Sequence, residues 1–311
     1  MRGDGAQVSV FAPATVANLG PGFDVLGLAL GGLGDVVTAR IGGAVGVRIA
    51  GVEGDGGALP REAHLNTAGI AAIETLKRAG VEARIELTIA KGMPMGSGLG
   101  SSAASAAAAA MAVNLLVGSP LRKVDLVAAC VEAEAAVSGR HADNVAPAIL
   151  GGLVLVRQLD PLDLIRLPVP EGLQVVVVTP DFELPTRLAR AALPREVPLG
   201  AMVRSVANTA ALVSACHSND LSLLGRCVVD EVATPVRAAL IPGAAAVMEA
   251  AQAAGALGSS ISGSGPSIFA LCRSPRSAGE VAEAMRRAFE AAGLGSRVHA
   301  CAADCPGARQ I

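Results

Sequence analysis

The chain has 311 residues, of which 52% are hydrophobic and 17% charged, and its net charge is −2. This length and composition allow a large buried core in one or two domains and exclude a disordered chain. The basic residues form no block and do not alternate with aromatic residues, which argues against nucleic acid as the main partner.

The cysteines and the apolar segments indicate the cellular setting. The six cysteines form no Cys-x-x-Cys pair and have no histidine at zinc-ligand spacing, so we expect reduced thiols in a cytoplasmic protein. The N-terminus lacks the basic-then-apolar pattern of a signal peptide. The longest weakly polar run, 103–117, is mostly alanine and is interrupted by Ser105 and Asn114, so we expect no membrane partner.

The N-terminal half mixes strands and helices without the strict alternation of a doubly wound sheet, which favours an α+β fold. Apolar spacing and turn-forming residues predict strands at 7–12, 35–41, 44–50, 83–90 and 151–156, and helices at 65–79, 102–117 and 121–137. The loop after the first strand, 13–24, carries Asn18 and Asp24, which either face a ligand or satisfy their own backbone.

A stretch rich in glycine and serine, 94–104, connects the strand at 83–90 to the helix at 102–117. Its alternating glycines let backbone N–H groups converge, and the following helix adds the positive end of its dipole, so the stretch predicts a phosphate site. A flexible linker is the alternative, and the strand directly before the stretch disfavours it. The stretch has neither the lysine of a Walker A loop nor the third glycine of a dinucleotide-binding fingerprint.

The helix at 121–137 carries two acidic residues, Glu132 and Glu134, in an otherwise apolar segment. Residues two apart face different sides of a helix, so we expect at most one of them to point inward. The loop that follows contains potential ligand-binding side chains at Arg140, His141, Asp143 and Asn144.

The polar, proline-rich segment 160–170 predicts a boundary between two domains, 1–158 and 159–311. Beyond it we expect strands at 173–179, 267–272 and 297–303, and helices at 186–193, 199–216, 221–232, 243–254 and 278–292. Pro235 is expected to end the helix at 221–232, with Arg237 just after it. A further glycine-rich loop lies at 259–266.

Four segments carry a resemblance to a known family. The stretch 94–103 contains Pro-x3-Gly-Leu-Gly-Ser-Ser-Ala and resembles the second motif of the GHMP kinases, and the loops at 17–24 and 261–266 lie where that family has its first and third motifs. Together with His-Ala-Asp-Asn-Val-Ala-Pro at 141–147, they are similar to the homoserine kinases within this family. The Gly-Glu-His type of first motif, which mevalonate kinases and galactokinases carry, is missing. The resemblance implies an N-terminal ribosomal-protein-S5-like α+β domain and a C-terminal ferredoxin-like α+β domain.

The resemblance also implies a site for ATP and Mg²⁺. The phosphate cradle would consist of Pro94, Met95, Gly96, Ser97, Gly98, Leu99, Gly100, Ser101, Ser102, Ala103 and Ala104. Ser102 and Glu134 would approach the Mg²⁺ as catalytic groups, whereas we expect Glu132 to be dispensable. Candidate contacts for the base of ATP are Asn66, Thr67 and Lys91, the alternatives being a helix cap for Asn66 and a solvated Lys91.

The second substrate that the resemblance implies is L-homoserine, whose ammonium and carboxylate must both be paired when they leave water. Asp24 would bind the ammonium, and Arg187 and Arg237 would bind the carboxylate. The acceptor site would be completed by Asn18, His141 and Asn144. The sequence leaves open whether Asp143 or Asn144 faces the reacting hydroxyl, and we expect positioning without a dedicated base, with Asp143 bracing its loop.

The predicted reaction is ATP-dependent phosphorylation of the L-homoserine hydroxyl, giving O-phospho-L-homoserine for threonine biosynthesis. Two alternatives are a related kinase for another small alcohol such as mevalonate, and a non-catalytic nucleotide-binding homologue. Mevalonate has no ammonium to pair with Asp24, and a nucleotide sensor has no need of Ser102 and Glu134 as metal ligands. The sequence leaves a homodimer open.

Overall fold

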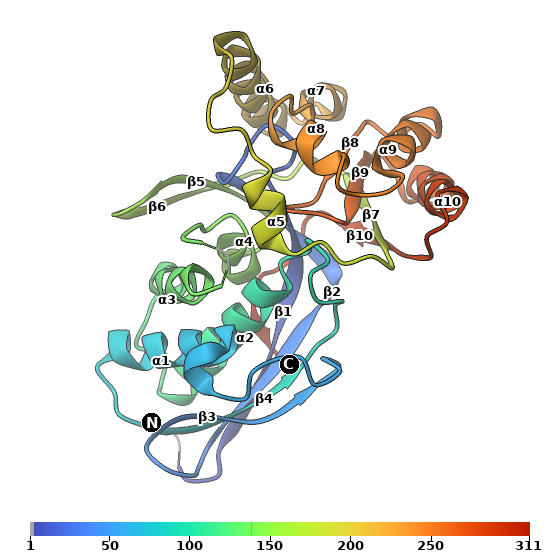
Figure 1. The fold of residues 1–311 in the computed structure, drawn as a ribbon. Helices are drawn as coiled ribbons and strands as arrows, with labels where there is room; N and C mark the ends of the chain where they lie inside the picture. Colours follow the sequence, from blue (N-terminus) through green and yellow to red (C-terminus); the bar gives the residue numbers. More distant parts are fainter. Residues whose placement is uncertain (1–2, 138) are drawn as a thin grey trace.

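The computed structural model describes residues 3–137 and 139–311, which form two lobes (Figure 1). The first lobe contains a seven-stranded sheet with the order β11-β1-β2-β4-β3, to which the β5–β6 hairpin is added through β2. Its strands are β1 (Gln7–Ala17), β2 (Leu26–Ile41), β3 (Gly46–Glu53), β4 (Arg84–Ala90), β5 (Leu153–Leu159), β6 (Leu162–Leu167) and β11 (Arg309–Gln310). Its helices are η1 (Ala63–Leu65), α1 (Thr67–Ala79), α2 (Ser101–Leu116), α3 (Lys123–Ala135) and α4 (Val145–Leu150).

Helix α2 is the central element of the first lobe. Its sequence, SSAASAAAAAMAVNLL, is apolar on every side, and nearly all of its residues are buried. Alanine favours the helix and has a small side chain, so the helix packs closely on α1, β1 and β2. Because the helix is buried along its length, its N-terminus at Ser101 is fixed inside the molecule.

The second lobe has a four-stranded antiparallel sheet with the order β10-β7-β9-β8. Its strands are β7 (Gln174–Pro180), β8 (Gly258–Ile261), β9 (Ile268–Cys272) and β10 (Ser296–Ala302). Its helices are α5 (Thr186–Ala191), α6 (Leu199–Ser218), α7 (Leu221–Cys227), α8 (Ala233–Ala238), α9 (Ala244–Ala253) and α10 (Pro275–Ala291). The predicted α+β class is confirmed, and α9 and α10 cover one face of this sheet as a ferredoxin-like domain requires (Figure 1).

The four consecutive valines of β7 show how the two lobes are joined. Side chains alternate between the faces of a strand. Val175 and Val177 belong to the hydrophobic core of the first lobe, whereas Val176 and Val178 pack with residues of α9 and α10. Both faces of β7 are therefore covered, and the shared core fixes one lobe against the other.

The predicted domain boundary falls at a different place from the change of sheet. A division between residues 158 and 159 would cut β5 before its last residue, separate the rest of it from its partner β6, and separate β11 from β1. The chain passes from the first sheet to the second between Leu167 and Gln174. The polar, proline-rich segment at 160–170 contains a hairpin turn and strand β6, and a hairpin turn has the same composition as a linker.

The region around Pro235 also differs from the prediction. Helix α7 ends at Cys227, and Pro235 lies in the first turn of α8, so it does not end a helix. A proline fits there because the first turn of a helix needs no N–H donor. Asp230 accepts hydrogen bonds from the backbone N–H groups of Val232 and Ala233 at 2.9 and 3.2 Å and thereby starts α8. Arg237 is consequently carried by a helix.

Helix α6 is long and apolar enough, by length and composition alone, to cross a membrane. A single helix of this kind is weak evidence for such a role. Much of its apolar surface is exposed, including Leu199, Met202, Val203 and Val206. The helix predicted at 199–216 is confirmed as α6, but the expectation of no membrane partner rested on the alanine-rich run 103–117 alone.

Candidate active site

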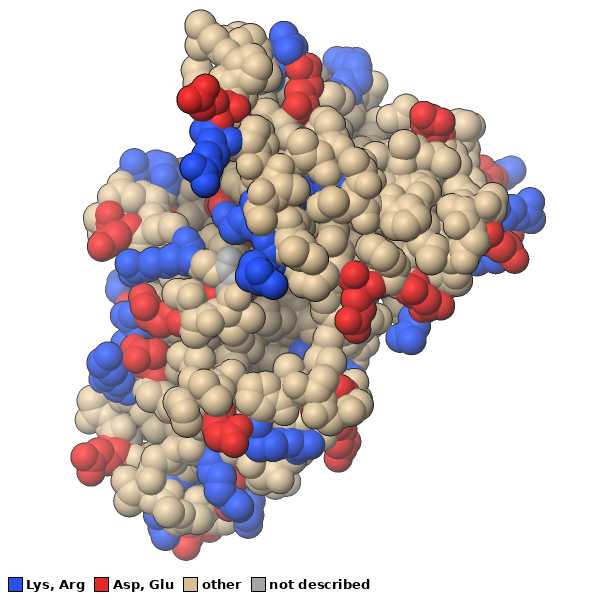
Figure 2. All heavy atoms as spheres, viewed as in Figure 1, with Lys and Arg blue, Asp and Glu red and all other residues tan. Residues whose placement is uncertain are grey.

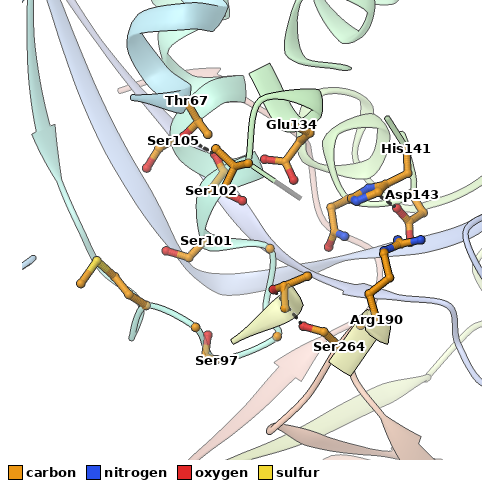
Figure 3. A pocket seen from close by; sticks show the side chains of 18 of the residues that line it. Thr67, Ser97, Ser101, Ser102, Ser105, Glu134, His141, Asp143, Arg190 and Ser264 are labelled. Atoms are coloured by element: carbon orange, nitrogen blue, oxygen red, sulfur yellow. Dashed lines mark hydrogen bonds and ion pairs between the residues drawn. The ribbon is translucent and has the colours of Figure 1, made fainter. Parts of the chain in front are cut away.

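A cavity of about 460 Å³ lies between the two lobes. Figure 2 shows the hollow from outside, with basic side chains at its upper edge, and Figure 3 shows the side chains that line it. The lining comes from the loop between β1 and β2, the segment 59–67 at the start of α1, Lys91, the glycine loop 95–100, α2, the end of α3, the loop before α4, α5, α8 and the loop at 263–264. Segments from both lobes therefore form one site.

The glycine loop owes its shape to three left-handed residues. Gly96, Gly98 and Gly100 have φ angles of 63°, 77° and 65°, a region that other residues rarely adopt. A Cβ at Gly98 would lie 2.5 Å from the carbonyl oxygen of Ser262, so the loop at 261–266 packs directly against it. The hydroxyl of Ser262 donates to the carbonyl of Gly98 at 2.7 Å. One glycine-rich loop thus supports the other.

The predicted cradle residues take two different positions. The cavity is lined by Met95, Gly96, Ser97, Gly98, Gly100, Ser101 and Ser102. Leu99, Ala103 and Ala104 are fully buried in the core, and Pro94 lines a second hollow on the other side of the loop. The side chains of these four residues therefore lie outside the cavity. The hydroxyl oxygens of Ser97 and Ser101 are buried without a hydrogen-bond partner among the described residues, which suits a ligand with several acceptor oxygens.

The two glutamates of α3 are separated as the sequence predicts. Glu134 is 3% exposed and lines the cavity, and Figure 3 shows its carboxylate and the hydroxyl of Ser102 in the same part of it. Glu132 lies outside the cavity and pairs with Arg140 on the surface at 3.1 Å. Across residues 3–137 and 139–311, no group of three or more His, Cys, Asp or Glu forms a metal cluster. A cation at Glu134 would therefore draw most of its ligands from a substrate and water, as Mg²⁺ commonly does.

The residues predicted for the base of ATP all line the cavity. Asn66 also caps α1, because its side chain accepts from the N–H of Ala68 at 3.0 Å. The alternative of a solvated Lys91 is wrong: its side chain is 2% exposed and forms an ion pair with Asp35. Its Nζ donates to the carbonyl of Ser101 at 2.9 Å and to the hydroxyl of Ser105 at 2.7 Å. Burial lowers the pKa of Lys91, and the charge of Asp35 opposes this effect.

Charged side chains gather at the opposite end of the cavity. Asp24 receives two hydrogen bonds of 3.1 Å from the guanidinium group of Arg190. Arg237 is 3% exposed and donates to the carbonyl of Gly263 at 2.6 Å. Both guanidinium groups lie against the ring of Phe23, at 5.7 and 5.3 Å from its centroid. Burial and the positive charge of Arg190 lower the pKa of Arg237, so an anion beside the two arginines would relieve their repulsion.

Arg190 occupies the position that was predicted for Arg187. Arg187 is exposed and does not line the cavity, whereas Thr186 and Arg190 both do. Residues four apart lie on one face of a helix, and a residue next to Thr186 is turned away by about 100°. If Thr186 is known to face the cavity, the four-residue spacing in α5 therefore predicts that Arg190 faces it too.

The other side chains predicted for the acceptor site are held by hydrogen bonds or an ion pair. Asn18 accepts from the N–H of Asp24 at 3.0 Å and donates to the carbonyl of Gly263 at 3.1 Å. His141 pairs with Asp143 through Nδ1 and Oδ1 at 3.2 Å. Burial alone would lower the pKa of His141, but its hydrogen bond to Asp143 and the nearby carboxylates outweigh burial and raise it. Asn144 also lines the cavity, and its Oδ1 accepts from the hydroxyl of Thr15 at 2.7 Å.

Known proteins match this chain over both lobes. Residues 66–152 match the family description "GHMP kinases N terminal domain", and residues 212–291 match "GHMP kinases C terminal". The homoserine kinase of Arabidopsis thaliana is 49% identical over 91% of this chain and 78% of its own length. The chain belongs to the GHMP kinases.

Other members of the GHMP kinases agree with the two-lobed fold. The homoserine kinase of Chloroherpeton thalassium is 45% identical over 97% of this chain and 99% of its own length. The crystal structure of homoserine kinase from Cytophaga hutchinsonii has a TM-score of 0.96 at 44% identity and covers 100% of this chain and 99% of its own. Mevalonate kinase of L. major, at 15% identity and a TM-score of 0.71, shows a common fold alone.

Proposed function

We propose that this GHMP kinase transfers the γ-phosphoryl group of ATP to the hydroxyl of L-homoserine, giving O-phospho-L-homoserine. One observation carries the choice of acceptor: a carboxylate and two guanidinium groups lie in the same cavity as the glycine loop. Asp24 can pair with an ammonium, while Arg190 and Arg237 can pair with a carboxylate. The relatives named homoserine kinase support this choice.

The ATP side of the proposal rests on the glycine loop and the start of α2. Backbone N–H groups of the loop, the N-terminus of α2 and the hydroxyls of Ser97 and Ser101, which have no hydrogen-bond partner among the described residues, are suited to phosphate oxygens. Lys91 is already engaged by Asp35, Ser101 and Ser105. We therefore assign to Lys91 the support of the first turn of α2 beneath the nucleotide.

The residues present also fit Mg²⁺. Ser102 and Glu134 offer one hydroxyl and one carboxylate oxygen donor in the cavity, which suits a hard cation that keeps phosphate and water ligands. When bound, Mg²⁺ supplies charge stabilisation at the phosphate oxygens. The Glu134 carboxylate would hold the metal on this side of the cavity and so set where the phosphates lie relative to the acceptor.

In this proposal the site aligns the acceptor hydroxyl with the γ-phosphate and provides no dedicated general base. Asp143 is buried and paired with His141, whose raised pKa favours the charged form that neutralises Asp143. We therefore assign the Asp143 carboxylate to bracing its loop. Phosphoryl transfer proceeds through a loose transition state that depends on alignment and charge stabilisation. Asn144, from the same loop, is the group that we assign to the reacting hydroxyl.

The test is an ADP-release assay with homoserine, mevalonate, galactose and shikimate offered separately. We expect homoserine alone to support turnover, because the other three lack the ammonium that Asp24 can pair. If mevalonate alone supported turnover, the proposal that homoserine is the acceptor would be wrong. Nucleotide binding without activity towards any acceptor would favour a non-catalytic role.

A further inference from the structure

A buried threonine outside the cavity connects its two ends. Thr15 lies on β1, is fully buried, and is not one of the residues that line the cavity. Its backbone N–H donates to the carbonyl of Leu99 in the glycine loop at 3.0 Å. Its hydroxyl donates to Oδ1 of Asn144, in the loop before α4, at 2.7 Å. A single residue is thus bonded to the phosphate cradle and to an acceptor-side residue.

The hydrogen bond between Thr15 and Asn144 is enclosed by the last glycine of the cradle. A Cβ at Gly100 would lie 2.1 Å from Thr15 Oγ1 and 2.8 Å from Asn144 Oδ1. No larger residue fits there, so Gly100 holds the two side chains together as well as turning the chain. The packing leaves Asn144 little freedom to rotate while this hydrogen bond is present.

The orientation of the Asn144 carboxamide follows from this bond. A carboxamide carries an acceptor oxygen on one branch and a donor NH₂ on the other. Because Oδ1 is bound to Thr15, Nδ2 is turned away from it, and within the described chain Nδ2 donates to no other residue although Asn144 lines the cavity. The site therefore presents N–H donors at this point, with the carbonyl oxygen withdrawn.

We propose that Thr15 is a positioning residue, which holds Asn144 so that its NH₂ group faces the reacting oxygens. Negative charge is spread over the transferred phosphoryl group and the acceptor oxygen in the transition state. N–H donors stabilise that charge, whereas a rotated carboxamide would bring its oxygen towards it and oppose the reaction. The inference rests on the proposed function for the identity of the acceptor, but the orientation of Asn144 rests on the geometry alone.

Two substitutions of Thr15 separate its hydroxyl from its shape. Thr15→Val keeps the volume and removes the donor, and we expect kcat to fall about 10- to 100-fold, as for the loss of a preorganised donor. The KM values for ATP and the acceptor should stay within about twofold, because Thr15 touches neither substrate. Thr15→Ser keeps the donor and should restore most of kcat. A kcat of Thr15→Val equal to that of the unchanged enzyme would overturn the proposal.

A double-mutant cycle tests whether Thr15 acts through Asn144. In an Asn144→Ala background, the further change Thr15→Val should alter kcat by less than about twofold, because the side chain that it positions is gone. If the fold-changes in kcat of Thr15→Val and Asn144→Ala multiplied in the double variant, Thr15 would act independently of Asn144, and the inference would be refuted. Thr75→Val is the matched control. Thr75 is also fully buried and its hydroxyl donates to the carbonyl of Ala71 at 2.7 Å, but it lies outside the cavity, so kcat should not change.

A spectroscopic measurement keeps the test independent of the acceptor. The side-chain amide resonances of Asn144 are identified in a ¹H–¹⁵N spectrum as the pair that disappears in Asn144→Ala. We expect this pair to shift in Thr15→Val and to keep its position in Thr15→Ser; an unchanged pair in Thr15→Val would contradict the inference. If the unchanged enzyme prefers another acceptor, the proposed function fails, and the same variants are compared with that acceptor. If no acceptor reacts, the spectra decide.

Discussion

The two ends of the cavity are built from different parts of the chain. At the end that we propose for ATP, called the ATP end below, the main elements are backbone groups, turned inward by Gly96, Gly98 and Gly100 in one continuous loop. At the acceptor end, the main elements are charged side chains, Asp24, Arg190 and Arg237, from three separate segments. A cradle made of backbone groups depends on the conformation of the chain, so one added Cβ atom disturbs it. A cluster of charged side chains depends on its functional groups, so one substitution removes a charge. Substitutions at the two ends should therefore change different kinetic constants.

The largest effect is expected where the two ends meet, at Glu134. Glu134→Ala removes the buried carboxylate that we assign to Mg²⁺, and kcat should fall about 1,000-fold, as for other groups that stabilise transition-state charge. ATP binding should be partly kept because the backbone cradle is intact. Glu132→Ala is the matched control from the same helix, since Glu132 pairs with Arg140 outside the cavity, and it should leave kcat unchanged. Normal turnover by Glu134→Ala would remove the metal assignment.

At the acceptor end, loss of either cavity arginine should weaken homoserine binding alone. Arg190→Leu and Arg237→Leu each remove charge-assisted hydrogen bonds to a carboxylate, and we expect the KM for homoserine to rise about 10- to 100-fold. The KM for ATP should stay within about twofold of its original value. Arg187→Leu, on the same helix as Arg190 but exposed, is the control and should change neither constant. A larger effect of Arg187→Leu than of Arg190→Leu would reverse the assignment.

At the ATP end, Gly98→Ala should have the opposite selectivity. The added Cβ would lie 2.5 and 2.6 Å from the carbonyl oxygens of Ser262 and Gly265, so the cradle must shift. We expect the KM for ATP to rise about tenfold, from strain of about 1 to 3 kcal/mol, with the KM for homoserine unchanged. Gly96→Ala is the control from the same loop, because its φ is also positive but no atom lies within 4 Å of the added Cβ, so its effect should be smaller. Equal effects at the two glycines would show that backbone strain alone, and not the contact with the second loop, shapes the cradle.

A smaller effect on the acceptor end is expected for Phe23. The guanidinium groups of Arg190 and Arg237 both lie over its ring, and we take each cation–π contact to contribute about 0.5 kcal/mol. Phe23→Leu should lower kcat/KM for homoserine about fivefold, because the two contacts together contribute about 1 kcal/mol and about 1.4 kcal/mol corresponds to a factor of ten. The activity with 3-aminopropan-1-ol, which has the ammonium and hydroxyl but no carboxylate, should change less. An equal loss with both acceptors would place the effect of Phe23 elsewhere than on the arginines.

The smallest expected effect is the contribution of His141 to the pH dependence of the free energy of unfolding. The pKa of His141 is raised in the folded protein, so its protonated form adds stability below about pH 6.5, and this stability is lost as the pH rises through the raised pKa. Between about pH 6.5 and the raised pKa of His141, the free energy of unfolding of the unchanged protein should therefore fall as the pH rises. Denaturant unfolding should show a smaller fall over the same pH range for His141→Gln. His217→Gln, at an exposed position near the end of α6, is the control. Identical pH profiles for His141→Gln and the unchanged protein would contradict the His141–Asp143 pairing.

The sequence by itself determined the fold class and predicted the glycine-rich cradle that we propose for ATP. The glycines, the alanine-rich helix and the spacing of Glu132 and Glu134 lie close together in the chain, and local conformation and helix periodicity follow from neighbouring residues. Only the tertiary structure decided the acceptor end and the limits of the sheets. In the tertiary structure Arg190, and not Arg187, lines the cavity, and Lys91 pairs with Asp35. Strand β11 pairs with β1 of the first sheet, and Thr15 donates a hydrogen bond to Asn144. Each of these contacts joins side chains or strands far apart in sequence, and their packing is set by the whole core.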